Sequence, residues 1–115
     1  MVRKFIPFEP ATITEEFRRL DSPHRAKLMY AMERFQESFI KVAPAAIKSG
    51  YPQGILEIRH QEGVYKGRAL FFERTSEQLI VLIVYRKESN KTPKRFIGLA
   101  LNRKHTHEKR NEEKG

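Results

Sequence analysis

The sequence predicts one small α+β domain, in which helices pack against a small antiparallel β-sheet. Three observations lead to this prediction. An apolar stripe with helical spacing occupies residues 28–42, the pattern becomes strand-like after Gly54, and a helical pattern returns after Thr92 and Pro93. A chain of 115 residues suits one domain with one core. We therefore expect residues 1–115 to form a single domain.

The first 20 residues are expected to form a strand and a short helix. Val2–Phe8 is rich in apolar residues and is bounded by prolines, which fits an edge strand. Thr12–Glu15 has the spacing of a capping box, in which a hydroxyl residue is followed three positions later by a glutamate. This motif predicts a helix from about Ile13 to Leu20.

A longer helix should follow, because Ser22 can act as its N-cap and Pro23 suits the first helical position. Its apolar stripe consists of Leu28, Met32, Phe35, Phe39 and Val42. We expect this helix to end near Lys41. A second short helical stretch is expected to run to Lys48 and to stop at Gly50.

Three strands are expected next, at residues 55–60, 65–74 and 79–86. The third strand contains Leu79–Val84, which is apolar on both faces, so it should lie inside the sheet with both faces covered. A last helix is expected from about Lys94 to Arg103 or beyond. The tail from about residue 108 is expected to be frayed.

The chain is strongly basic, with 23 lysines and arginines, 14 acidic residues and a net charge of +9. Such an excess favours a polyanionic partner, and nucleic acid is the first candidate, although a merely soluble basic protein is the alternative. The absence of cysteine excludes disulfides, thiolate metal sites and thiol nucleophiles. No apolar stretch approaches the roughly 20 residues that span a bilayer, and no signal peptide is recognisable. We expect a cytoplasmic protein without a membrane segment.

Pairing the three predicted strands brings basic residues together. A tight turn after residue 60 sets Arg59 opposite Lys66 and Glu57 opposite Arg68, and the next turn sets Arg74 opposite Leu79. Counting back, Arg68 then faces Tyr85 and Lys66 faces Lys87. The residues expected to share one face at one end of the sheet are Arg59, Lys66, Arg68, Tyr85 and Lys87.

The other end of that face should belong to the core, through Leu70, Phe72, Val81 and Ile83. Like charges placed opposite one another destabilise paired strands, so an anion or Glu57 should compensate the cluster. Each cation alone could simply point into water. For the group we favour a phosphate-binding surface.

The segment from Arg86 to Arg95 extends this positive surface. Its candidate RNA-binding residues are Arg86, Lys91, Lys94 and Arg95, together with Lys66 of the preceding strand. Among the histidines, His60 is expected to be packed or hydrogen-bonded rather than catalytic, and His105 is a secondary candidate for proton transfer. The spacing of His105 and His107 does not place both on one helical face, so no metal site is expected.

Several segments resemble the RelE/HigB-like toxins of type II toxin–antitoxin modules. Ile58–His60 and Tyr65–Phe72 resemble the middle hairpin of these toxins. Val84–Lys87, followed by Lys91–Arg95 and by Ala100–Arg103, is similar to the phage-derived, HigB-like branch. The resemblance covers about residues 54–104, and the helical N-terminal half agrees in layout.

This resemblance implies a RelE-like α+β fold and a metal- and cofactor-independent endonuclease that cuts mRNA on the ribosome and inhibits translation. It also implies a cognate antitoxin, often a helix-turn-helix protein. By position it assigns Arg59, Arg68 and Lys87 to the site first, and Lys66 and Tyr85 after them. The extra Lys66–Gly67 before Arg68 departs from the pattern and leaves open which cation comes first.

Cleavage through the ribose 2′-OH needs a base, a cation at the phosphate and an acid at the leaving oxygen. Arginine suits the phosphate, and Tyr85 or a histidine could move protons, while Tyr85 could equally stack on a base. Two alternatives stay open: a basic module that binds RNA or the ribosome without cleavage, and a gyrase-targeting toxin on the same scaffold.

Overall fold

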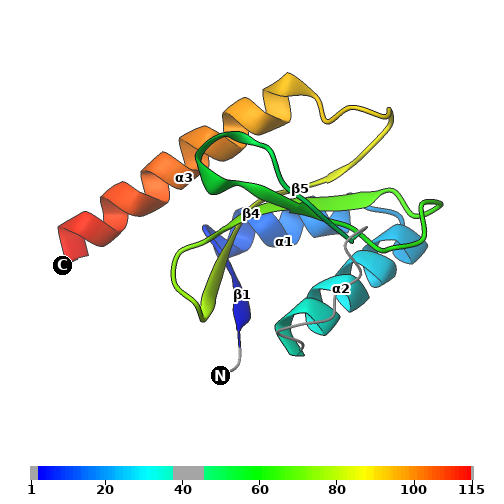
Figure 1. The fold of residues 1–115 in the computed structure, drawn as a ribbon, viewed down its shortest axis with the longest axis horizontal. Coiled ribbons are helices and arrows are strands. Elements are labelled where there is room, and N and C mark those ends of the chain that lie inside the picture. Colours follow the sequence, from blue (N-terminus) through cyan, green and yellow to red (C-terminus); the bar gives the residue numbers. More distant parts are fainter. Residues whose placement is uncertain (1–2, 38–45, 115) are drawn as a thin grey trace.

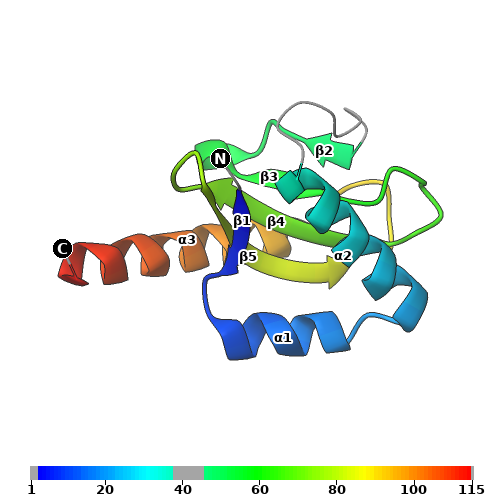
Figure 2. The ribbon, with the colours of Figure 1, turned by 90° about the horizontal axis from the view of Figure 1, so that it is seen from below.

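The computed structural model describes residues 3–37 and 46–114, which form a five-stranded mixed sheet with helices on both faces (Figures 1 and 2). The elements in chain order are β1 (Lys4–Pro7), α1 (Pro10–Arg18), α2 (Ser22–Glu37), β2 (Ile47–Lys48), the 3-10 turn η2 (Pro52–Gly54), β3 (Leu56–Ile58), β4 (Gly67–Glu73), β5 (Gln78–Arg86) and α3 (Lys94–Lys114). The strand order is β1-β5-β4-β3-β2. The α+β prediction is confirmed.

The sheet is mixed rather than wholly antiparallel, because β1 pairs in parallel with β5 while the other neighbours are antiparallel. Two helices follow β1 before the chain enters the rest of the sheet, and β5 later lies beside β1 and runs in the same direction. As predicted, the edge strand is closed by a proline, and the apolar β5 lies inside the sheet with Leu79–Tyr85 buried.

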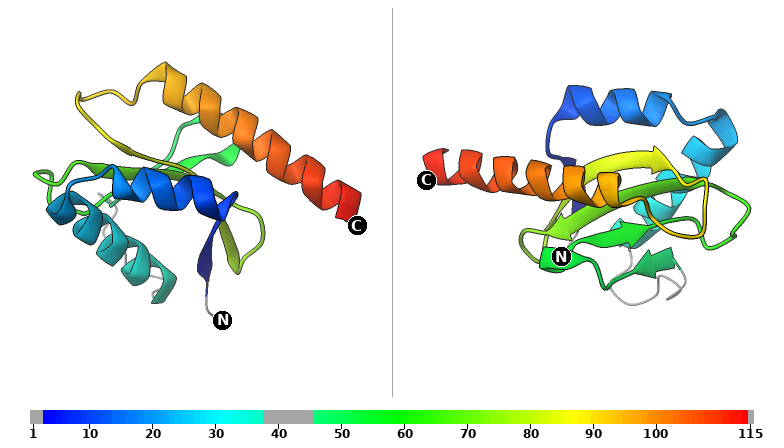
Figure 3. Two further views of the ribbon diagram at one scale, coloured as in Figure 1. Left: turned by 180° about the vertical axis from the view of Figure 1, so that it is seen from behind. Right: turned by 90° about the horizontal axis from the view of Figure 1, so that it is seen from above.

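The sheet separates two apolar layers, and helices cover both of them (Figure 3). α1 and α2 cover one face of the sheet, where Leu28 and Phe35 pack with Phe71. α3 crosses the other face, where Ala100 packs with Leu70 and Leu82. Each face of the sheet therefore has its own apolar layer, which explains the doubly apolar pattern of β5.

A β-bulge in β5 separates the site end of the sheet from the turn end. Arg68 pairs with Tyr85 and Leu70 with Ile83, but Phe71 then pairs with Val81, so Leu82 is the extra residue. Beyond the bulge the register differs by one from the prediction, and Leu79 lies opposite Glu73 rather than Arg74. Val81 consequently packs on the α1–α2 side, not on the predicted face with Leu70 and Phe72.

An ion pair between α1 and α3 covers the part of β5 that β1 does not reach. Glu16 accepts a hydrogen bond from the Val84 backbone N–H at 2.8 Å, and Arg103 donates to the Leu82 carbonyl at 2.9 Å. Arg103 and Glu16 also contact each other at 2.7 Å, with side chains 17% and 11% exposed. These two side chains satisfy the backbone groups that the bulge and the short edge strand leave unpaired.

Two expected boundaries are corrected. α1 begins at Pro10, after Glu9, rather than at Ile13. Proline suits the first turn of a helix, so the helix starts there and not at the predicted capping box. Residues 47 and 48 form β2 instead of ending a short helix, since they pair with Ile58 and Glu57 of β3. The predicted end of the second helix, including Phe39, Lys41 and Val42, lies outside the described residues.

The last helix extends to Lys114, past Arg103, and the expected fraying from about residue 108 stays a prediction. Lys104 pairs with Glu108 at 3.3 Å one turn later, and Asn111 donates to the His107 carbonyl at 3.0 Å. Arg110 lies 3.8 Å from Glu9, which ties the outer half of the helix to the start of α1. In the described part of the chain, no helix has the length and apolar character needed to cross a bilayer.

Candidate functional site

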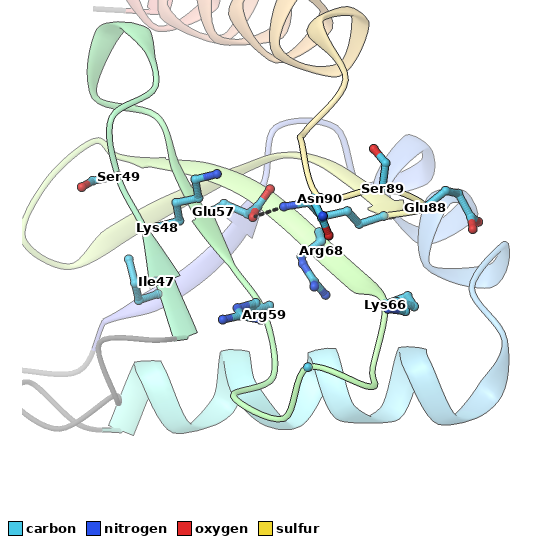
Figure 4. A pocket seen from close by; sticks show the side chains of 12 residues that line it. Ile47, Lys48, Ser49, Glu57, Arg59, Lys66, Arg68, Glu88, Ser89 and Asn90 are labelled. Atoms are coloured by element: carbon cyan, nitrogen blue, oxygen red, sulfur yellow. Dashed lines mark ion pairs between the residues drawn. The ribbon is translucent and has the colours of Figure 1, made fainter.

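An open pocket of about 680 Å³ lies between the β2–β3 pair and the connection from β5 to α3 (Figure 4). Five of its lining residues are basic, namely Lys48, Arg59, Lys66, Arg68 and Lys87. Its two carboxylates are Glu57 and Glu88, and Ser89 and Asn90 complete its rim. Cations from β2, from the connection between β3 and β4, from the start of β4 and from the residue after β5 therefore meet at one place.

Arg68 is held in position by backbone oxygens at the start of β4. Its residue is 5% exposed, and Nη1 donates to the carbonyls of Tyr65 at 2.8 Å and Gly67 at 2.9 Å. Its buried Nε has no hydrogen-bond partner within the described residues. Burial lowers the pKa of Arg68, and Glu57 opposes that shift. A guanidinium that lines the pocket and is held by two backbone oxygens suits recognition of an anionic oxygen.

Glu57 is the counter-charge inside this cluster, and it is only 1% exposed. Its Oε1 lies 3.7 Å from Lys87 Nζ, an ion pair drawn as a dashed line in Figure 4. Its Oε2 accepts hydrogen bonds from the hydroxyls of Tyr85 and of Thr92, the latter at 2.8 Å, and Tyr51 lies 3.4 Å away. The prediction that Glu57 would compensate the cations is confirmed by this geometry.

Lys87 is the pocket cation with the most constrained ammonium group, because its side chain is 12% exposed. Burial lowers the pKa of Lys87, Glu57 raises it, and Lys48, Arg68 and Arg59 lower it further. The net shift is downward, so Lys87 releases its proton more readily than a solvated lysine.

Tyr85 lies below the pocket rather than in it. The residue is 5% exposed, its hydroxyl is bound to Glu57, and its ring packs against Phe96 with centroids 4.5 Å apart. Burial raises the pKa of Tyr85, and the hydrogen bond to Glu57 raises it further. Such a phenol neither stacks on a base nor exchanges protons readily, which argues against the role expected from the sequence.

The predicted strand pairing holds where it matters most. Arg68 does face Tyr85, as expected, but Glu57 pairs with Leu70 and not with Arg68. The error is two residues, and side chains alternate between faces with a period of two. Glu57 and Arg59 therefore stay on the same face as Arg68, and the cluster forms despite the slip.

The remaining basic candidates separate into one pocket residue and four others. Lys66 is exposed and lines the pocket. Arg86 does not line the pocket, and it pairs with Asp21 at 3.1 Å and with the pocket residue Glu88 at 2.9 Å. Lys91, Lys94 and Arg95 are exposed on the β5–α3 connection and the first turn of α3, and none of them lines the pocket.

The histidines lie outside the pocket. His60 is 6% exposed, and its Nδ1 accepts a hydrogen bond from the Glu62 N–H at 3.1 Å, so the expectation of a packed histidine is confirmed. His105 is exposed on α3 and does not line the pocket. Within residues 3–37 and 46–114, no three His, Asp or Glu side chains come close enough to hold a metal ion.

The sequence did not point to three residues of the site. Lys48 reaches the pocket from β2, a strand of two residues that is too short to show a period. Tyr51 and Thr92 hydrogen-bond each other at 2.8 Å although they are 41 positions apart. A hydroxyl contact at that separation leaves no local signal in a single sequence.

Comparison with known families matches residues 15–105 to the family described as "Phage derived protein Gp49-like (DUF891)". The matched region contains every basic residue of the pocket, together with Glu57 and its hydroxyl partners. A comparison with curated proteins gave no significant match.

Proposed function

The chain belongs to the Gp49-like family of phage-derived proteins, which is associated with the toxins of toxin–antitoxin modules, and from this premise we propose that it is a ribosome-dependent mRNA endonuclease. It would inhibit translation in the cytoplasm and would need no metal ion. The observation that carries the proposal is the convergence of five cations on one pocket around a buried carboxylate.

The pocket supports attack of a ribose 2′-OH on the adjacent phosphate. Arg68 is fixed by backbone oxygens and, with Arg59 and Lys66, would stabilise the crowded phosphate. We assign proton transfer to Lys87, whose lowered pKa brings its neutral and charged forms closer in energy. Neutral Lys87 would take the proton of the 2′-OH as the 2′ oxygen bonds to phosphorus and the bond from phosphorus to the 5′ oxygen breaks. The ammonium so formed would return that proton to the leaving 5′ oxygen, which leaves a 2′,3′-cyclic phosphate and a 5′-OH end.

Reliance on the ribosome agrees with the openness and sparseness of this site. Positioning can supply a large part of a rate enhancement, and the shallow pocket encloses little of an RNA strand. A ribosome that presents the mRNA in a fixed conformation would supply what the pocket lacks. A cognate antitoxin partner follows from the family, and we propose that it is a helix-turn-helix protein encoded beside this chain.

The test compares Lys87→Met with Arg86→Gln. Both remove one positive charge at the end of β5, Arg86 being its last residue and Lys87 the next, but only Lys87 lines the pocket. Expression without an antitoxin should arrest growth and cut mRNA within translated codons. Lys87→Met should slow cleavage about 10²-fold or more and relieve the arrest, while Arg86→Gln should keep both.

Arg68→Lys serves as a second pocket variant that keeps the charge but loses the guanidinium. It should reduce cleavage while circular dichroism and the Tm show a folded protein. Undiminished cleavage in folded Lys87→Met and Arg68→Lys proteins would remove the pocket from the reaction.

One observation favours a second candidate, a basic module that binds RNA or the ribosome without cutting it. Tyr85 is covered, and the described histidines lie outside the pocket, so Lys87 is left as the main group for proton transfer. Steeply salt-dependent binding with intact RNA after long incubation on translating ribosomes would select this candidate.

A further inference from the structure

A row of aromatic rings lies between α2 and the connection from β3 to β4. The ring centroids of Tyr30 and His60 are 6.0 Å apart, those of His60 and Tyr65 are 5.2 Å apart, and those of Tyr65 and His24 are 6.2 Å apart. Tyr30 and His24 come from α2, and the other two come from the connection. The row joins two segments through ring contacts along its whole length.

Part of this row is open to solvent. Tyr30 is 49% exposed, whereas the neighbouring His60 is 6% exposed, and their rings are tilted by 35°. Val64, at the tip of the connection, is 68% exposed. Tyr65 is partly buried, so Tyr30 is the one exposed ring of the row, and its contact with buried His60 makes it a preformed platform for a ligand.

Two cations flank the platform. Lys27 Nζ lies 5.2 Å from the Tyr65 ring centroid, and the Arg34 guanidinium carbon lies 5.8 Å from that of Tyr30. A protein partner would need a larger and more apolar surface than two tyrosines between cations. An unpaired base with its phosphates is complementary to this combination of rings and positive charge.

The platform and the phosphate pocket share the connection from β3 to β4, although none of the four rings lines the pocket. The same connection that carries His60 and Tyr65 supplies Arg59, Gly63 and Lys66 to the pocket lining. His24 Nδ1 accepts a hydrogen bond from the Lys66 N–H at 2.9 Å, which fixes this connection to α2. In Figure 4, α2 runs below the connection, and the labelled Arg59 and Lys66 lie above the helix.

We propose that Tyr30 and Tyr65 form a base-stacking site for a nucleotide next to the one whose phosphate enters the pocket. This inference rests on the proposed function, since it needs RNA in the pocket. The strand would pass over the 59–66 connection, with its phosphate near Arg59 and Lys66 and its neighbouring base against Tyr30. The platform would thereby select single-stranded RNA, whose bases are free to stack.

The test measures binding of a short single-stranded RNA and of copies in which one nucleotide at a time is abasic. The RNA carries 2′-O-methyl groups, so that it is not cleaved. Tyr30→Ala should weaken binding of the intact RNA about tenfold, and Tyr30→Phe should bind like the unaltered protein. For the RNA that is abasic at the stacking position, Tyr30→Ala and the unaltered protein should bind equally.

Met29→Ala is the matched control, because Met29 is the adjacent residue of α2 and is 47% exposed. It should change binding less than twofold. The platform proposal is overturned if the Tyr30→Ala protein binds intact RNA normally. It is also overturned if this protein binds the intact RNA and all the abasic RNAs more weakly to the same extent. Loss of antitoxin binding with normal RNA binding would overturn it as well, and would make the patch a protein interface.

Failure of the platform and failure of the proposed function are distinguishable. Lys87→Met acts on the pocket and should reduce cleavage on the ribosome whether or not a base stacks on Tyr30. If Tyr30→Ala binds RNA normally while Lys87→Met abolishes cleavage, only the platform is lost. If neither variant alters cleavage or binding, the proposed function is lost with it.

Discussion

Replacing Glu57 by Gln should destabilise the protein while strengthening its binding to RNA. The substitution keeps the volume of a side chain that is 1% exposed and removes the charge that faces Lys87 at 3.7 Å. The hydroxyls of Tyr85 and Thr92 also lose a charged acceptor. A fall in stability together with a rise in RNA affinity, caused by one substitution, is therefore the specific expectation for this pocket.

The size of the stability loss follows from the contacts of the carboxylate. Breaking a buried ion pair costs about 3–5 kcal/mol when one charge is left unpaired, and the open side of the pocket lets water reduce that cost for Lys87. Hydrogen bonds to a charged acceptor contribute about 1.5–3 kcal/mol, of which glutamine retains part. We expect the free energy of unfolding to fall by about 2–4 kcal/mol.

RNA binding should respond in the opposite direction. The pocket loses its buried negative charge, and Lys87 no longer divides its charge between Glu57 and a phosphate. One unit charge at about 4 Å in a solvated site is worth about 1 kcal/mol, so affinity at low salt should rise on the order of fivefold.

Urea unfolding measures the first change, and fluorescence anisotropy with a non-cleavable RNA measures the second. Glu88→Gln is the stability control, because Glu88 is 73% exposed in its ion pair with Arg86 and should cost less than about 1 kcal/mol. A Glu57→Gln protein as stable as the unaltered one, or one with weaker RNA binding, would refute the compensating role of this carboxylate.

Three further substitutions test the surroundings of the site. Arg103→Ala should cost about 2–4 kcal/mol in urea unfolding, because it leaves a carboxylate and a backbone carbonyl of β5 unpaired, whereas Arg110→Ala, whose pair is 52% and 40% exposed, should cost less than about 1 kcal/mol. Burial and its bond to a carboxylate raise the pKa of Tyr85 above the usual 10.0, so its contribution to stability is complete below pH 10 and is lost as the pH rises above it. Tyr85→Phe should therefore lower Tm at neutral pH but reduce the further fall of Tm between pH 9 and 11, which circular dichroism melts would detect. Gly67→Ala places a Cβ 2.9 Å from the His24 carbonyl oxygen, and we expect a loss of about 1–3 kcal/mol; unchanged stability would show that β4 can move away from α2.

The fold class and the cation cluster could be predicted because both depend on alternation along strands. Arg68 in β4, Arg59 just after β3 and Lys87 just after β5 point to the same face of the sheet. A slip of two residues between β3 and β4 did not change that face, because side chains alternate with a period of two. The bulge at Leu82 lies on the far side of Leu70, so it altered the core at Val81 but not the pairing of Arg68 with Tyr85.

The parts that failed depend on tertiary contacts that a single sequence does not encode locally. Sharing a face did not reveal depth: Tyr85 shares the face of Arg68, yet Phe96 of α3 covers it, and the helix position sets that burial. Arg86 belongs to the same basic run as Lys87, but neighbouring residues in an extended chain point to opposite faces. Arg86 therefore points away from the face of Lys87 and forms an ion pair with Asp21.

The buried carboxylate explains how the pocket can exist before RNA arrives. Five cations in one pocket repel one another, and without compensation the strands that carry them would be destabilised. Glu57 supplies that compensation through its ion pair with Lys87, and the hydroxyls of Tyr85 and Thr92 hold its carboxylate. The Arg68 guanidinium stays oriented by the backbone. Under the proposed function, a phosphate would then compete with Glu57 for Lys87, which would weaken binding of the substrate and of the cleaved ends alike. The same residue would then both preorganise the site and limit its affinity, as turnover on successive mRNAs would require.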